Sequence, residues 1–129
     1  MNIPDNLRYT REHEWISLDG NVVTIGVTDY AQEQLGDIVY VEFPKEGELV
    51  NSGETFGVLE SVKAVSDCYT PVAGKIVEVN EPLADTPETV NEDCYGEGWL
   101  IKVELNNTSE MDAFMDANAY KAFVEEESA

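Results

Sequence analysis

Cationic side chains are scarce in this sequence. Its 129 residues contain 7 Lys and Arg against 27 Asp and Glu, which gives a formal net charge of −20. Nucleic acids and anionic membranes are bound through basic patches, so this balance argues against both as partners. The acidity favours partners with basic docking surfaces, and it serves equally well as a means of keeping a protein in solution.

Cysteine and histidine are also rare, and no apolar run approaches the length of a transmembrane helix. Cys68 and Cys94 lack CxxC spacing and are too few for a disulfide framework, so we expect both to be reduced and buried. His13 is the only histidine and has no companions that would complete a metal site. The N-terminus carries no apolar signal segment, so we expect a cytoplasmic protein or the mature form of a mitochondrial one.

Short β-branched runs hold most of the apolar residues. The length fits a single domain spanning residues 1–129. Turn signals recur about every eight to twelve residues, which predicts a mainly β fold, a small barrel or sandwich over about 12–104. The expected strands cover residues 14–18, 22–27, 37–43, 49–50, 55–62, 65–69, 75–79 and 99–104.

One short helix is expected within this strand-rich part. Thr28 is a good N-cap for a helix over residues 30–35, and Gly36 ends it. Residues 80–98 contain prolines, glycines and many acids. This composition predicts a long surface excursion with two short helical turns.

The apolar period becomes helical from Ser109, and we expect helices over about 109–126. Ser109 and Asp112 resemble a capping box, and residues 116–118 separate two short helices. Two apolar faces would pack on the strands, one with Met111, Phe114 and Met115 and the other with Ala119, Ala122 and Phe123.

A single lysine lies between two apolar runs that predict a hairpin, with Lys63 and Ala64 at its tip. Tight hairpin turns favour Asn, Asp or Gly because their central residues need positive φ, and neither residue meets this need. A local rule broken without visible compensation often marks a functional site. Most turn lysines only add solubility, so the interpretation depends on the surrounding motifs.

Glycines and a Pro-Val-Ala-Gly-Lys turn accompany the lysine in a fixed order. The order Gly47, Gly53, Glu60-Ser61-Val62-Lys63 and residues 71–75 resembles the lipoyl/biotinyl swinging-arm domain. Biotinyl carriers usually have methionines on both sides of the lysine, whereas Val62 and Ala64 are similar to the lipoyl side of the family. Further blocks resemble the family of H proteins of the glycine cleavage system; they are residues 12–15, 26–32, 35–37, 60–64, 66–67 and 91–99.

This resemblance implies a fold and a function. The fold is a flattened lipoyl/biotinyl-type barrel-sandwich hybrid with a short helix after the first hairpin and C-terminal helices. The function is that of a carrier and not an enzyme, with lipoate joined to Lys63 by an amide bond. The arm then takes the aminomethyl group of glycine from a pyridoxal-phosphate-dependent glycine decarboxylase to a tetrahydrofolate-dependent aminomethyltransferase. A dihydrolipoyl dehydrogenase reoxidises the dithiol.

Other parts of the site and its partners also follow from the resemblance. A lipoate ligase or lipoyl transferase would attach the cofactor, and the carrier would be a monomer. The acidic positions of the family's arm-docking cleft fall on Glu14 and Asp67. The resemblance places no role on Glu12.

Several alternatives remain open at this point. An H-like lipoyl relay for 2-oxoacid dehydrogenases would have the same lysine, and a biotinyl carrier would have the same fold. The residues flanking Lys63 argue against biotin but do not distinguish the relay from glycine cleavage. An enzyme with paired carboxylates is disfavoured because the sequence shows no set of nucleophile, base and orienting group. A purely structural barrel would leave the ordered motifs unexplained.

Overall fold

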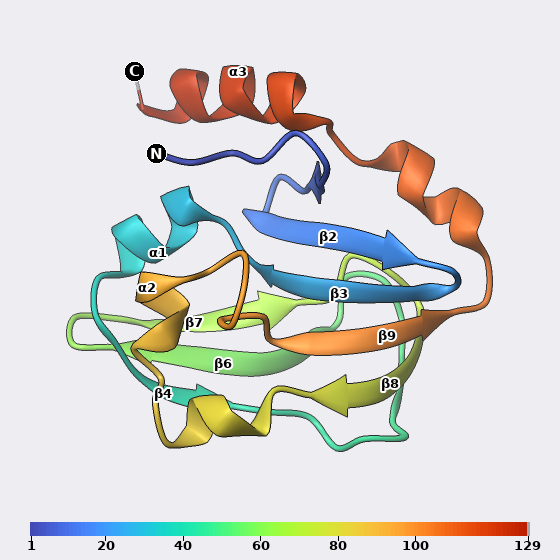
Figure 1. The fold of residues 1–129 in the computed structure, drawn as a ribbon, viewed down its shortest axis with the longest axis horizontal. Coiled ribbons are helices and arrows are strands. Elements are labelled where there is room, and N and C mark those ends of the chain that lie inside the picture. The colour runs from blue at the N-terminus through green and yellow to red at the C-terminus, as the bar shows by residue number, and fades with distance from the viewer. Residues whose placement is uncertain (129) are drawn as a thin grey trace.

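The strands form two open sheets in this computed structural model, which describes residues 1–128 (Figure 1). The strands are β1 (Arg8–Tyr9), β2 (Glu14–Asp19), β3 (Val22–Val27), β4 (Ile38–Glu42), β5 (Leu49–Val50), β6 (Thr55–Ser61), β7 (Val65–Tyr69), β8 (Gly74–Val79) and β9 (Ile101–Leu105). The six-stranded sheet has the order β1-β2-β3-β9-β8-β5, and the three-stranded sheet has the order β4-β6-β7. The mainly β fold expected from the sequence is therefore confirmed.

Helices are short and lie around the sheets. They are α1 (Asp29–Leu35), α2 (Thr89–Glu92), α3 (Ala117–Ser128) and the 3₁₀ helices η1 (Glu81–Ala84) and η2 (Thr108–Ala113). As expected, the hydroxyl of Thr28 caps α1 by accepting a hydrogen bond from the Ala31 amide, and Gly36 ends the helix with a φ of 80°. No helix in residues 1–128 has the length and apolar character needed to cross a membrane.

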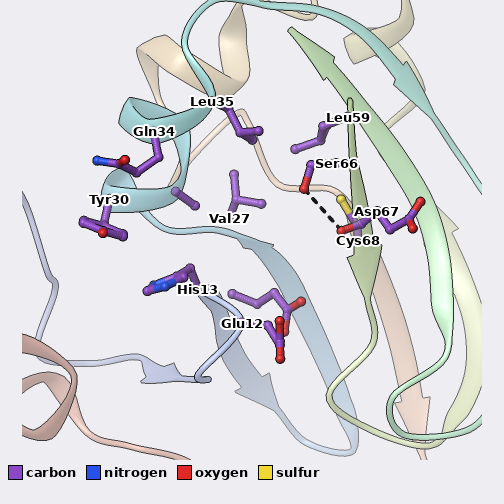
Figure 2. Close-up of a pocket in the computed structure, with 12 residues that line it drawn as sticks. Glu12, His13, Val27, Tyr30, Gln34, Leu35, Leu59, Ser66, Asp67 and Cys68 are labelled. Carbon is purple, nitrogen blue, oxygen red and sulfur yellow. Dashed lines mark hydrogen bonds between the residues drawn. The ribbon is translucent and has the colours of Figure 1, made fainter. Parts of the chain in front are cut away.

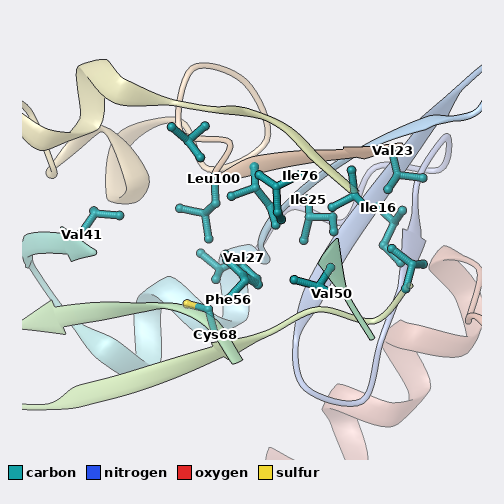
Figure 3. Close-up of a cluster of buried hydrophobic side chains, with 14 of the residues drawn as sticks. Ile16, Val23, Ile25, Val27, Val41, Val50, Phe56, Cys68, Ile76 and Leu100 are labelled. Carbon is teal, nitrogen blue, oxygen red and sulfur yellow. The ribbon is translucent and has the colours of Figure 1, made fainter. Parts of the chain in front are cut away.

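The two sheets enclose a hydrophobic core (Figure 3). Side chains alternate along a strand, so Val23, Ile25 and Val27 all face inward from β3. Phe56 and Leu59 of β6 meet them from the other sheet. The β-branched runs identified in the sequence are thus the strands whose inner faces build this core.

The two helical turns expected between β8 and β9 are confirmed as η1 and α2, but the segment is tied to the core more closely than a surface excursion would be. Leu83 on η1 and Val90 on α2 expose 1% and 0% of their surface. The Asn80 side chain donates hydrogen bonds to the carbonyls of Glu97 and Trp99, each 2.7 Å long, which joins the two ends of the segment. Leu83 and Val90 thus hold the segment against the sheets, although the composition of the segment is that of a loop.

Helix α3 packs on a strand, as expected, and this strand is β1 at the N-terminus, which the sequence analysis did not include among the strands (Figure 1). The ring of Tyr120 stacks on that of Tyr9 with centroids 4.7 Å apart. This contact sets the rotation of the helix, so its buried face carries Ala117, Tyr120 and Val124. The expected face is wrong, because Ala119 and Ala122 are exposed and only Phe123 is partly buried.

The chain before α3 is capped differently from the expectation. The Asn107 side-chain oxygen accepts hydrogen bonds from the amide and hydroxyl of Ser109, at 3.0 and 2.8 Å. The helix therefore begins one residue before Ser109, as a 3₁₀ turn, and the expected capping box of Ser109 and Asp112 does not start it. A break between two helices is present as expected, but it lies at residues 114–116 and not at 116–118, because α3 begins at Ala117. Asp116 accepts a hydrogen bond from the Ala119 amide at the start of α3.

Candidate functional site

The lysine identified in the sequence lies at the tip of the β6–β7 hairpin. The Ser61 amide donates a 2.8 Å hydrogen bond to the Ala64 carbonyl, and Val62 and Lys63 lie between them. The tip is thus one residue earlier than expected. The Ser61 hydroxyl accepts hydrogen bonds from the amides of Lys63 and Ala64, at 3.3 and 3.0 Å. This side-chain oxygen closes the turn without positive φ, and the serine two residues before the lysine was its signal in the sequence.

The Lys63 side chain is exposed and lies along the turn that follows α1. A Cβ atom added to Gly36 would be 3.2 Å from Cε and 3.9 Å from Nζ of Lys63. The adjacent Val62 amide donates a 3.1 Å hydrogen bond to the Asp37 carbonyl. The hairpin tip is therefore braced against this turn while the amine remains accessible.

A cleft of about 200 Å³ lies between α1 and β7 (Figure 2). Its apolar walls include Val27, Leu35 and Leu59. Leu35 immediately precedes Gly36, where an added Cβ would lie 3.2 Å from Cε of Lys63, so the lysine side chain lies near the Leu35 end of the cleft. An apolar chain attached to Lys63 fits these walls, which makes the site compatible with a folded-back prosthetic arm.

Glu14 is a buried carboxyl at this cleft, with 4% of its surface exposed. Its pKa is raised from 4.5 to about 7, chiefly by burial and to a smaller extent by the nearby Glu12 carboxylate. The Thr10 hydroxyl donates a 2.9 Å hydrogen bond to Oε1, and this bond and the backbone amide of Tyr69 oppose the rise. Glu14 therefore carries a carboxyl that changes its ionisation near neutral pH.

The structure does not bring the Asp67 carboxylate into the cleft beside Glu14. Asp67 lines the cleft, but Figure 2 shows its side chain on the opposite side of β7 from Leu35. The neighbouring Ser66 and Cys68 point inward, and alternation along the strand turns Asp67 outward. Glu12, to which the sequence assigned no role, lines the cleft as well.

His13 forms another part of the cleft wall, with a positive φ of 66°. Its Nδ1 lies 2.8 Å from the Tyr120 hydroxyl, and its Nε2 lies 2.7 Å from Oε2 of Glu127. Its carbonyl accepts a hydrogen bond from the Thr28 amide, so His13 connects α1 and α3 with the cleft. Sequence reasoning missed this role because the contact between His13 and Tyr120 joins residues that are 107 positions apart in the chain.

An exposed lysine on a braced hairpin of a two-sheet β scaffold, beside an apolar cleft, is the arrangement expected of a carrier domain that holds a prosthetic group on a lysine. The sequence profile of the glycine cleavage H-protein family matches residues 7–127. The chain therefore belongs to the glycine cleavage H-protein family.

Individual relatives agree over almost the whole chain. The glycine cleavage system H protein of Anaeromyxobacter sp. (strain K) is 58% identical over 127 residues, covering 98% of this chain and 99% of the relative. The protein of the same name from Bacteroides fragilis is 56% identical over 124 residues, covering 96% and 98%. A crystal structure of a glycine cleavage system H protein from Mycobacterium marinum superposes with a TM-score of 0.85 at 40% identity, covering 93% of this chain and 97% of that one.

Proposed function

We propose that Lys63 carries lipoate through an amide bond between Nζ and the lipoyl carboxyl group, and that the carrier serves glycine cleavage. The observation that supports this best is the accessible lysine at the end of an apolar cleft that contains a buried carboxyl. When bound, lipoate would supply a disulfide that takes up the aminomethyl group as glycine loses CO2, so that one sulfur bonds the methylene and the other becomes a thiol. The protein supplies presentation, and the cofactor supplies the chemistry.

The hairpin presents the modified lysine in turn to glycine decarboxylase, aminomethyltransferase and dihydrolipoyl dehydrogenase. A tethered group meets each active site at a high effective concentration, provided that the tether reaches. The brace between Val62 and Asp37 keeps the base of this tether fixed. The net charge of −20 suits basic docking surfaces on these enzymes.

The cleft shelters the loaded arm between visits. Its apolar walls exclude water, and Glu14 pairs with the cationic amine of the aminomethyl group. A nearby cation favours the ionised carboxyl and lowers its pKa, so Glu14 is ready to become charged when the amine enters. Asp67 also lines the cleft, and Glu12 joins it as a further carboxylate because its charge acts on Glu14.

The attachment is tested by mass spectrometry of the intact protein and its peptides after treatment with a lipoate ligase. The expected result is a lipoyl-sized increase on the peptide containing Lys63, and none in Lys63→Arg. Lys45→Arg is the matched control, since it removes another surface lysine and should leave the modification intact. An unmodified parent would overturn the proposal, and a biotin-sized increase from native cells would replace lipoate with biotin.

A further inference from the structure

The Asn91 side chain in α2 pairs with one edge of the segment that joins α1 to β4. Its Nδ2 donates a 2.9 Å hydrogen bond to the Gly36 carbonyl, and its Oδ1 accepts a 2.8 Å bond from the Ile38 amide. The second Nδ2 hydrogen bond goes to the Gln32 side chain at 3.0 Å. One side chain thus satisfies a carbonyl and the amide two residues later, as a neighbouring strand would.

The opposite edge of the same segment supports the lysine hairpin. The Asp37 carbonyl accepts a 3.1 Å hydrogen bond from the Val62 amide, and Ile38 is paired with Ser61 across β4 and β6. The Lys63 side chain lies over Gly36, where an added Cβ would be 3.2 Å from Cε. Residues 36–38 therefore lie between Asn91 and the base of the lysine side chain.

We propose that Asn91 is a positioning residue for the lipoylation of Lys63, acting through the Gly36–Asp37 turn. This inference rests on the proposed function. The turn includes Gly36 in the left-handed region at φ 80°, and the backbone of a glycine is less restricted than that of other residues. Asn91 holds the Gly36–Asp37 turn in place. This turn then orients the hairpin tip and the Lys63 side chain for the enzyme that modifies Nζ. Small displacements of a reacting group strongly lower the rate of a positioned reaction.

Asn91→Asp tests this role, because aspartate keeps the size and an acceptor but loses both donated hydrogen bonds. The lipoylation rate with a purified lipoate ligase, followed by intact mass, should show kcat lower by about fivefold or more, with KM for the protein within about twofold. Asn106→Asp makes the same charge change at an exposed position and should match the parent. Amide hydrogen exchange should become faster at Val62 and stay unchanged at Leu59 inside β6.

Gly36→Ala perturbs the same turn without changing Asn91, since its methyl group would meet the Lys63 side chain. It should lower kcat in the same way. An Asn91→Asp protein with the parent's kcat would overturn the inference. Faster exchange at Leu59 together with Val62 would also overturn it, because the role would then be general stability. If the parent is not lipoylated, the proposed function fails. If the parent is lipoylated and the variants are lipoylated at the same rate, only this inference fails.

Discussion

Replacing Glu14 with glutamine should change how stability depends on pH. The folded-state pKa of Glu14 is about 7 against an ordinary 4.5, chiefly because the side chain is buried. One pKa unit corresponds to about 1.4 kcal/mol, so the ionised carboxyl destabilises the folded state by about 3 kcal/mol. Below the unfolded-state pKa the carboxyl is protonated in both states and has no effect. Stability is lost as the pH rises from 4.5 towards 7, and the full loss is present above about pH 7.

Glu14→Gln removes the charge and keeps an oxygen that accepts the hydrogen bond from Thr10. We expect the free energy of unfolding of this variant to equal that of the parent near pH 4 and to exceed it by up to about 3 kcal/mol near pH 8. Urea unfolding at about pH 4, 6 and 8 measures the difference in the free energy of unfolding between the two proteins. The contributions of other titrating groups largely cancel in this difference.

Glu12→Gln is the matched control, because Glu12 lines the same cleft but is exposed. Its effect on stability should be within about 1 kcal/mol at each pH, as for other exposed charges. A constant difference between Glu14→Gln and the parent from pH 4 to pH 8 would refute the reasoning, since a raised pKa requires the difference to grow with pH.

Three further predictions follow from single features of the fold. Gly26→Ala places a methyl group 2.5 Å from Nε1 of Trp15, so urea unfolding should show a loss of about 2 kcal/mol, and a loss below about 0.5 kcal/mol would contradict it. His13→Ala should be less stable than His13→Gly by about 1 kcal/mol, because alanine is strained at a φ of 66°; equal stabilities would argue against this strain. Burial raises the pKa of the Cys68 and Cys94 thiols to about 12. A maleimide at about pH 8 should therefore label both cysteines only after the protein is unfolded in urea. Prompt labelling of the native protein would contradict this prediction.

Local signals were sufficient to predict most elements of the fold. The strand over residues 22–27 and the helix N-cap at Thr28 were predicted from neighbouring residues alone, and both predictions are confirmed. The buried face of α3 depends instead on the stacking of Tyr120 on Tyr9, which lies more than a hundred residues away. The attachment of the segment between β8 and β9 likewise depends on long-range contacts of Leu83 and Val90, so composition alone did not show that it is anchored in the core.

The candidate site was predictable to the extent that its motif is local. Lys63 was found from its flanking residues, and Glu14 lies at the cleft as the resemblance implied. The orientation of Asp67 follows from alternation along β7, in which its neighbours Ser66 and Cys68 point inward. His13 and Asn91 were missed because their side chains join elements that only the tertiary fold brings together.

Loading of the modified protein with glycine tests the central claim most directly. The lipoylated chain is incubated with glycine and a purified glycine decarboxylase, and the peptide containing Lys63 is analysed by mass spectrometry. We predict a glycine-dependent increase of aminomethyl size on the lipoyl-Lys63 peptide, with no increase when the decarboxylase is omitted. A lipoylated peptide whose mass stays unchanged, while the H protein of Bacteroides fragilis is loaded under the same conditions, would contradict a role in glycine cleavage.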